Sequence, residues 1–371
     1  MDGISKKVIH HAGFTPLEFL INVVQLILTL RVVGLSYEIE DSIQNGGNTN
    51  EKTRFVKVPN TLEAFNYLYN FIGLFTGPYY TYQIYSDTLE STAIYDVDIT
   101  EFISERVLTI SWSLPSLLIV YGLAPLEFLR SEAVSSTNFI VLMFWVCIAF
   151  YYLRLRIYTA WMIAECICIT SGIGVYPASC NNVPSGGPQN IEAYNKLKNK
   201  LNIKYDAVTI SNLDIPNVEM STGFRNGMRA WNRSVQYWLA TFVYKRSPKS
   251  IRMPYTMFIS AFWHGLHIGY FLSFMTIPLC TAAEDLIYKV VPIDKQTGER
   301  PKWFQFIWLN IRTRSFELMA SGFLLLTWTD TARLWNAMYW YIHIVMISII
   351  VGSKLIIESR EKSDNDKMKV N

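Results

Sequence analysis

The stretch FISAFWHGLHIGYFLSFMTIPLC, from Phe258 to Cys280, decides how the rest of the chain is interpreted. It lies inside a run from Met253 to Ala283 that contains no Asp, Glu, Lys or Arg. A run of this length can cross a bilayer, which takes roughly 20 apolar residues. The sequence therefore predicts a membrane span with an ionisable side chain, His264, at its centre.

An imidazole at membrane depth is costly, so it usually faces a polar cavity and works there. The alternative is a structural histidine that bonds a neighbouring helix, and His264 taken alone leaves both open. Its surroundings favour a functional role. His267 follows three residues later and is expected on a similar helix face. Gly265 and Gly269 allow a backbone or a ligand to approach closely.

The composition is that of a membrane protein. Hydrophobic residues make up 51% of the 371 residues and aromatic residues 15%, and the mean hydropathy is positive. A net charge of +3 gives no indication of a nucleic-acid partner. The five cysteines show no CxxC pair and no zinc-ligand spacing, so reduced thiols and no metal site are expected.

Other apolar segments predict roughly seven spans in total, together with re-entrant pieces. Gly73, Gly77 and Pro78 interrupt the stretch from Glu63 to Tyr85, which has no charge in its interior. This pattern predicts a short helix entering a re-entrant or interfacial loop. The tail from Glu358 to Asn371 mixes both charge signs and is expected to be disordered. The remaining apolar segments are Phe19–Leu35, Val107–Leu129, Ala133–Leu153, Ile157–Tyr176, a shorter one at Phe316–Trp328, and Leu334–Ser353.

Four charged or ionisable residues in these segments are expected to be structural. Arg154 and Arg156 should mark the end of one span. Glu165 lies inside the next span and is expected to face one of these arginines rather than to catalyse. His343, inside the last span, is also expected to be structural.

A basic region runs from Lys196 to Arg252, where eleven Lys and Arg residues are opposed by three acidic residues. It could anchor the cytosolic side of the membrane or bind a polyanionic ligand such as a nucleotide phosphate. Within it, Met228 to Tyr244 carries Trp231 and Asn232 between basic ends. This segment predicts an amphipathic or interfacial helix that is too short and too charged to span the membrane alone.

Two motifs resemble the signature of the membrane-bound O-acyltransferase family. They are MRAWNRSVQYWL, with Asn232, and SAFWHGLHIGYFLSFMTIPLC, with His264, in the family's order of Asn before His. The segments YLYNFIGLFTGPYYTY, GIGVYPASCNNVPSGGP and SFMTIPLCTAAED resemble its lysophosphatidylinositol acyltransferase branch. The resemblance extends from about Thr15 to the last helix.

The resemblance implies an all-α, polytopic helix bundle in the endoplasmic-reticulum membrane, with re-entrant segments that enclose a catalytic chamber. It implies transfer of a polyunsaturated acyl group from acyl-CoA to the sn-2 hydroxyl of lysophosphatidylinositol. The partners would be membrane lipids and these two substrates, and acyl-CoA would be a co-substrate with no further cofactor. Within the enzyme class, the acceptor could instead be another lysophospholipid, a sterol, diacylglycerol or a protein. A transporter or scaffold is the alternative from another class, but no inverted repeat is visible.

The residues fit this chemistry. A neutral imidazole at His264 can take the proton of an attacking hydroxyl. The amide of Asn232 can stabilise the oxyanion or orient the thioester, and the sequence does not choose between these roles. No serine or cysteine stands in an activating motif, which favours direct transfer. The substrate-binding candidates are Trp231 and Trp263, beside the two catalytic residues, and the basic residues Arg229, Lys245, Arg246 and Arg252.

The N-terminus carries one more expectation. The segment Phe19–Leu35 resembles one that follows several membrane helices in this family, whereas this chain opens with the polar stretch Met1–Ala12. We therefore expect residues 1–371 to form a single membrane domain that lacks the family's N-terminal helices.

Overall fold

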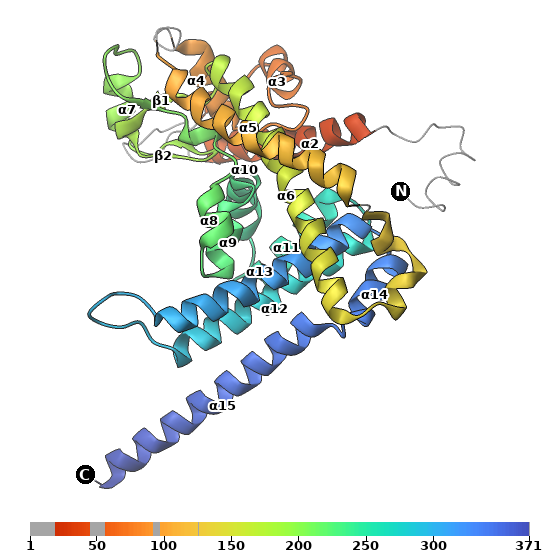
Figure 1. The fold of residues 1–371 in the computed structure, drawn as a ribbon. Helices are drawn as coiled ribbons and strands as arrows, with labels where there is room; N and C mark the ends of the chain where they lie inside the picture. Colours follow the sequence, from red (N-terminus) through yellow and green to blue (C-terminus); the bar gives the residue numbers. More distant parts are fainter. Residues whose placement is uncertain (1–18, 45–55, 92–96, 125, 371) are drawn as a thin grey trace. The chain divides into compact units, whose positions relative to one another are not determined.

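The computed structural model describes residues 19–44, 56–91, 97–124 and 126–370 (Figure 1). The opening stretch Met1–Ala12, on which the N-terminal expectation depends, lies outside these residues. The chain forms two compact units, which are described separately below. The first unit comprises Met1–Ile119, Arg154–Asp214 and Arg229–Arg252, and the second comprises Val120–Leu153, Ile215–Met228 and Met253–Asn371.

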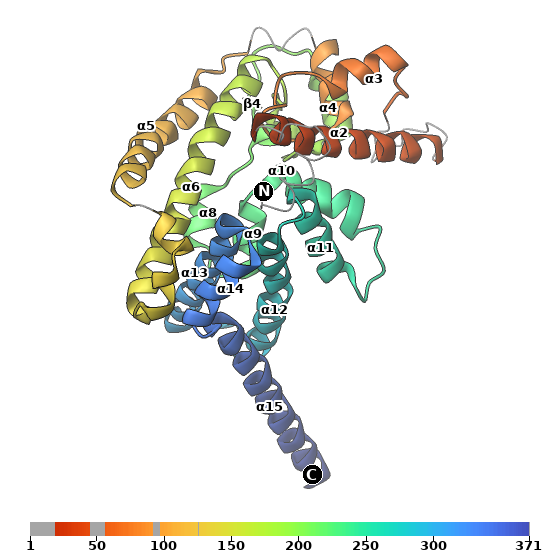
Figure 2. The same ribbon diagram turned by 90° about the vertical axis from the view of Figure 1, so that its right-hand side faces the viewer.

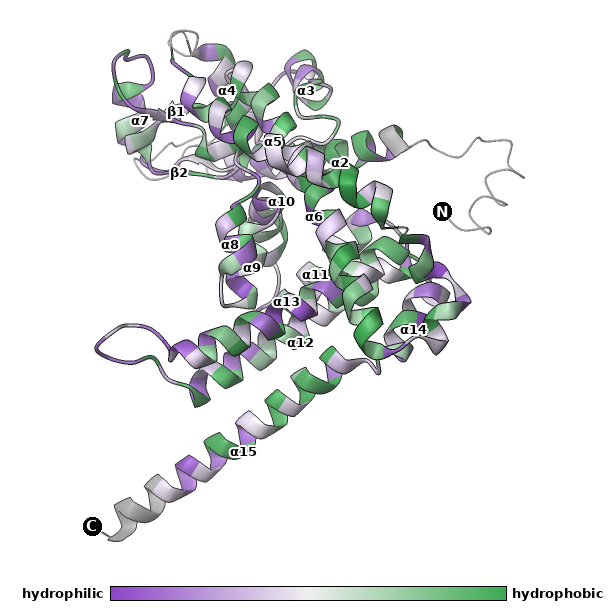
Figure 3. Ribbon diagram, viewed as in Figure 1, coloured by the Kyte–Doolittle hydropathy of each residue, from purple (hydrophilic) through white to green (hydrophobic). Residues whose placement is uncertain are grey.

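The fold is all-α and polytopic, as predicted. In the part of the chain that the structure describes, five helices are long and apolar enough to cross a membrane, rather than the roughly seven expected. Figure 3 shows the apolar character of α5 and of the first half of α15. The five segments are Ile21–Gln44, Thr100–Leu123, Phe139–Thr170, Ile268–Val290 and Tyr341–Ser363.

The first unit begins with α2 (Phe19–Gln44), α3 (Thr61–Leu68) and α4 (Tyr82–Glu90), which pack together (Figure 2). Between α3 and α4 the chain is irregular, which confirms the predicted short helix and loop. The fully buried Arg31 guanidinium holds this loop. It donates to the carbonyl oxygens of Asn70 and Ile72, each at 2.7 Å. These carbonyl oxygens lie outside any helix, so the guanidinium supplies the hydrogen bonds that a helix would otherwise provide.

The helices α5 (Thr100–Leu123) and α6 (Phe139–Thr170) correct two predictions. The expected spans Ala133–Leu153 and Ile157–Tyr176 largely merge into α6, because no Gly or Pro interrupts this helix at Arg154 and Arg156. Glu165 is structural, as expected, but its partner is different. It pairs with Arg106 of α5, at 2.9 Å between Nε and Oε2, because these side chains meet across two packed helices.

The rest of the first unit consists of short elements. The strands β1 (Tyr176–Pro177) and β4 (Tyr205–Asp206) pair antiparallel, as do β2 (Asn182–Val183) and β3 (Gly187–Pro188). The helices are α7 (Ile191–Leu197), α10 (Arg233–Trp238) and a π-helix at Leu239–Tyr244, with 3₁₀ turns at Ala178–Cys180 and Val208–Ile210. Buried tyrosines, including Tyr67, Tyr80 and Tyr176, contribute to the core of this unit.

The second unit is a helical bundle in which α12 (Ile268–Val290) packs against α13 (Lys302–Leu325) and α15 (Tyr341–Val370). The expected apolar segment Phe316–Trp328 forms mostly the end of α13. A turn with positive φ at Tyr339 and Trp340 divides the expected span Leu334–Ser353 between α14 and α15. The other elements are α8 (Ile215–Met220), α9 (Phe224–Ala230), α11 (Arg252–His264), α14 (Trp328–Ala337) and 3₁₀ turns at Leu126–Arg130 and Glu132–Ser136.

Two further expectations about helices are corrected. The run from Met253 to Ala283 is not one helix, because the chain leaves α11 after His264 and enters α12 at Ile268. The tail expected to be disordered continues α15 as far as Val370. Its Glu, Lys and Arg residues are good helix formers, and neither Gly nor Pro stops the helix there.

Candidate active site

His264 is the last residue of α11. Gly265 follows with a φ of +135°, an angle at which any other residue would be strained. The second predicted small residue, Gly269, makes the close approach that the sequence indicated. A Cβ there would lie 2.2 Å from the carbonyl oxygen of Gly322 in α13. The two glycines therefore set the imidazole beside a tight bend, against a closely packed helix pair.

Aromatic rings surround the His264 imidazole. The Phe274 ring stacks on it at 5.1 Å between centroids, and the Phe323 ring meets it edge-on at 5.0 Å. Tyr270 contributes a third ring at 5.7 Å, and Trp263 a fourth at 4.5 Å. Among the described residues, neither imidazole nitrogen has a hydrogen-bond partner. Both nitrogens are therefore available to a substrate.

The same surroundings control the charge of His264. The residue is half-buried by surface area, but the dense aromatic shell disfavours the charged form. Burial lowers the pKa of His264 to about 3. The stable form at neutral pH is thus the neutral imidazole, which can accept a proton.

His267 does not lie on a shared helix face with His264, because the residues between them are not helical. It is the N-cap of α12, with extended backbone. Its ring meets Tyr270 edge-on at 5.6 Å, so the Tyr270 ring contacts both histidines. The prediction from helical spacing is wrong, although the two rings share a neighbour.

Asn232 stands at a break in the predicted helix Met228–Tyr244. It is in the left-handed conformation, with φ 48° and ψ 53°, between α9 and α10. Asparagine is one of the few residues that adopts this conformation readily. Its side chain makes no capping hydrogen bond to α10 and has no hydrogen-bond partner among the described residues. The side-chain amide is therefore free.

Trp231, next to Asn232, packs against α6. Its ring lies 6.2 Å from the ring of Tyr158 and 5.7 Å from that of Trp161. Trp231 and Asn232 belong to the first compact unit, whereas Trp263 and His264 belong to the second. The pairing of Asn232 with His264, and substrate contact by either tryptophan, remain predictions.

The four basic candidates fall into two pairs. Arg246 is engaged by Asp41, at 2.6 Å between Nη2 and Oδ2, and lies over the Tyr37 ring. Arg252 donates from Nε to the Ser247 carbonyl oxygen at 2.9 Å. Arg229 and Lys245 are exposed, and neither forms an ion pair with a residue that the structure describes. Of the four candidates, only Arg229 and Lys245 have a side-chain charge that no described residue engages.

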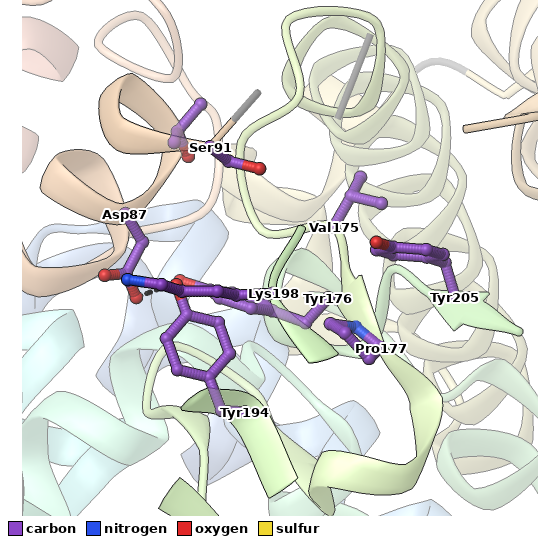
Figure 4. Close-up of a pocket in the computed structure, with 9 residues that line it drawn as sticks. Asp87, Ser91, Val175, Tyr176, Pro177, Tyr194, Lys198 and Tyr205 are labelled. Atoms are coloured by element: carbon purple, nitrogen blue, oxygen red, sulfur yellow. Dashed lines mark hydrogen bonds between the residues drawn. The ribbon is translucent and has the colours of Figure 1, made fainter. Parts of the chain in front are cut away.

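A small pocket in the first unit contains none of the predicted site residues (Figure 4). The Tyr176 hydroxyl donates to Asp87 Oδ2 at 2.9 Å, and the Gln83 amide donates to Asp87 Oδ1 at 3.0 Å. These bonds engage both oxygens of the Asp87 carboxylate. Its lining residues are Asp87, Thr88, Ser91, Val175, Tyr176, Pro177, Tyr194, Lys198 and Tyr205.

No pattern in the sequence indicates a role for Asn212. Its side-chain oxygen accepts hydrogen bonds from the backbone and the hydroxyl of Ser234, two residues after Asn232. Asn212 lies in a coil, and no local pattern in the sequence links it to α10. Only the tertiary fold brings the two together.

Known proteins resemble this chain over most of its length. The family model described as MBOAT, membrane-bound O-acyltransferase family, matches residues 8–315. The membrane-bound acylglycerophosphatidylinositol O-acyltransferase mboa-7 of Caenorhabditis elegans is 41% identical over 347 residues, which cover 93% of this chain and 76% of that protein.

Two vertebrate proteins, both named membrane-bound acylglycerophosphatidylinositol O-acyltransferase, are also similar. The Xenopus laevis protein is 34% identical over 365 residues, with 93% of this chain and 76% of that protein covered. The Homo sapiens protein is 33% identical over 352 residues, with 91% and 73% covered. The matched family model and these identities lead to one conclusion: the chain belongs to the membrane-bound O-acyltransferase family.

Proposed function

We propose that this chain transfers a polyunsaturated acyl group from acyl-CoA to the sn-2 hydroxyl of lysophosphatidylinositol, in the membrane of the endoplasmic reticulum. The observation that carries the proposal is the 41% identity, over 93% of the chain, to a protein named acylglycerophosphatidylinositol O-acyltransferase. The five apolar helices of spanning length among the described residues fit an enzyme whose acceptor is a membrane lipid.

His264 is the general base of the proposed reaction. Its imidazole takes the proton of the sn-2 hydroxyl while the hydroxyl oxygen attacks the thioester carbonyl carbon. The carbon–sulfur bond then breaks, and the coenzyme A thiolate recovers that proton from the imidazolium. The neutral state of His264 and its unpaired nitrogens support this role. General-base catalysis of this kind contributes about 10²- to 10⁴-fold.

Asn232 is the proposed donor to the carbonyl oxygen, which becomes negatively charged as the hydroxyl attacks. Its amide has no described protein partner to compete with the substrate, and its left-handed backbone fixes the direction of the Cα–Cβ bond. One oxyanion donor of this type is worth about 2.7–4 kcal/mol of transition-state stabilisation. Orientation of the thioester by the same amide would give a similar dependence on Asn232.

Arg229 and Lys245 are the proposed contacts for the anionic head of acyl-CoA. Both are exposed, and neither is paired with a described acidic residue. Arg246 is a weaker candidate than the sequence indicated, because binding a phosphate would compete with its ion pair to Asp41. Such charge-assisted contacts bind substrate and transition state alike, so they act on KM.

No described contact distinguishes inositol from another head group, so the acceptor follows from the named relatives. Family membership argues against the alternative of a transporter or scaffold.

The test is a competition assay in microsomes that express the full chain. The microsomes receive equal amounts of lysophosphatidylinositol, lysophosphatidylcholine, lysophosphatidylethanolamine and lysophosphatidylserine, with isotopically labelled polyunsaturated and saturated acyl-CoA. Mass spectrometry then measures the labelled products against microsomes with an empty vector. We expect labelled phosphatidylinositol, formed mainly with the polyunsaturated chain. Label only in another lipid class, or no label above the empty-vector control, would reject the proposal.

A further inference from the structure

We propose that Asn212 is a positioning residue for Asn232: it caps helix α10 from a separate segment and so leaves the Asn232 amide free for acyl transfer. This inference rests on the proposed function, because it assigns a task to the free amide. Asn212 is not a catalytic residue, since it acts only through the backbone around Asn232.

The first N–H groups of a helix have no partner within the helix, and the side chain of the N-cap residue usually accepts one of them. Two asparagines of the first unit do this. Asn60 accepts from the backbone of Glu63 at 2.9 Å, and Asn190 accepts from that of Ala193 at 3.0 Å. Both have extended backbone, whereas the N-cap Asn232 is left-handed and makes no such bond.

Asn212 accepts these hydrogen bonds instead. Its carbonyl oxygen accepts from the Arg233 N–H at 2.9 Å, and its Oδ1 accepts from the Ser234 N–H at 3.1 Å. The Ser234 hydroxyl also donates to Oδ1, at 2.7 Å. Asn212 and Ser234 are each only 2% exposed, so without this contact the amides would be buried without partners.

The same segment holds the chain on the other side of Asn232. The Asp214 N–H donates to the Ala230 carbonyl oxygen at 3.0 Å. Hydrogen bonds therefore fix the backbone both before and after Asn232. A left-handed residue costs free energy and persists only where its surroundings determine it, and these bonds supply that constraint.

A buried ion pair in turn holds Asn212. The Asn212 N–H donates to Glu165 Oε1 at 2.7 Å, and Glu165 Oε2 accepts from Arg106 Nε at 2.9 Å. Glu165 is 1% exposed and Arg106 is 9% exposed, and they come from α6 and α5. Two long helices thus fix Asn212, and Asn212 fixes the start of α10.

Loss of the Asn212 side chain should let Asn232 turn its own side chain toward the open amides of α10. That movement withdraws the amide from the substrate, and a misplacement of about 1 Å can cost 10²-fold in rate. Substrate affinity should change little, because no acyl-CoA contact is removed.

The test compares Asn212→Ala with Asn190→Ala in the full-length chain, purified in detergent and assayed with acyl-CoA and lysophosphatidylinositol. Both substitutions remove an asparagine that caps a helix in the same unit, so Asn190→Ala controls for loss of stability. We expect Asn212→Ala to lower kcat per folded enzyme by about 10- to 100-fold, with KM for acyl-CoA within about twofold of wild type. Asn190→Ala should lower only the melting temperature.

A milder variant keeps the test decisive if Asn212→Ala does not fold. Ser234→Ala removes one of the two bonds to Asn212 Oδ1 and should lower kcat by a smaller factor, again at constant KM. A kcat within twofold of wild type in every folded variant of this pair, or a raised KM at constant kcat, would overturn the inference. Absence of lysolipid acylation by the wild-type chain would instead reject the proposed function.

Discussion

Two histidines of the second unit, His264 and His343, lie in similar aromatic surroundings but differ in their hydrogen bonds. His343 packs against the rings of Trp335 and Trp340, at 5.2 and 5.1 Å between centroids, much as His264 packs against Phe274. However, His343 Nε2 lies 3.1 Å from the Thr276 hydroxyl, which ties α15 to α12. His264 has no such partner among the described residues. Aromatic packing alone therefore does not identify a catalytic histidine, and neither does one unpaired nitrogen, because His343 Nδ1 is buried without a partner. The two residues differ in that a hydrogen bond holds the His343 ring to a neighbouring helix.

Two asparagines repeat the contrast in the first unit. Asn190 uses its side chain to cap α7, whereas Asn232 leaves its side chain free at the start of α10. In each pair the bonded residue serves the fold, and the free residue is the candidate for chemistry.

The largest expected effect is on the histidine pair. His264→Ala should lower turnover by at least about 100-fold, because it removes the general base. His343→Ala should retain most of the activity of the protein that folds. Turnover is measured with labelled acyl-CoA and divided by the amount of folded enzyme. If His264→Ala kept more than about a tenth of wild-type turnover, His264 would not be the general base. If both variants lost activity equally, the distinction between a catalytic His264 and a structural His343 would be wrong.

The next effect is on the asparagine pair. Asn232→Ala should lower kcat by about 10²- to 10³-fold, because an oxyanion donor acts mainly in the transition state. KM for acyl-CoA should change much less, and Asn190→Ala should leave both constants unaltered. Initial rates over a range of acyl-CoA concentrations separate the two constants. A raised KM at unchanged kcat would make Asn232 a ground-state binding residue.

Thr276→Val sharpens the structural side of the comparison. It removes the hydroxyl that bonds His343 and nearly preserves the side-chain volume. We expect a loss of about 1 kcal/mol of stability, typical of one intramolecular hydrogen bond, with turnover unaffected. Thermal unfolding in detergent measures the loss of stability, and the acyl-transfer assay measures turnover. Lower turnover at equal folded protein would show that His343 also serves the reaction.

The smallest effects concern the basic residues. Arg229→Ala and Lys245→Ala should each raise KM for acyl-CoA by about two- to fivefold, as expected for exposed ionic contacts. Arg246→Ala should act mainly on stability, because Arg246 already pairs with Asp41. If KM is unchanged in the first two variants, these residues do not bind acyl-CoA, and anchoring of the cytosolic side of the membrane is the role left for the basic region.

Local patterns in the sequence were sufficient to predict part of this arrangement. The glycines beside His264 predicted close approach, and the backbone of α13 does come within reach of Gly269. Glycine and proline after α3 predicted the irregular loop. In both cases the signal lies in residue types whose backbone preferences are intrinsic.

The remaining features depend on contacts between distant segments. Glu165 pairs with Arg106 rather than with the nearby Arg154 or Arg156, and only the packing of α5 on α6 decides this. Asn212 reaches α10 through the tertiary fold. The helix break at His264 also has no signal in the sequence, because an uncharged run of this length predicts one span whether or not the chain bends.

His264 is proposed to act as a neutral base, and the pH dependence of kcat tests this role. Because burial lowers the pKa of His264 to about 3, its imidazole stays neutral from pH 5 to 8. An ordinary imidazole, with a pKa near 6.5, would instead be protonated as the pH falls through that value.

The measurement is kcat per folded enzyme at saturating acyl-CoA and lysophosphatidylinositol, in the wild type and in His343→Ala. We expect a kcat that stays level from pH 8 down to pH 5 in both proteins. A fall of about tenfold per pH unit below 6.5 in both would contradict it, because the base would then be an ordinary imidazole that titrates near neutrality.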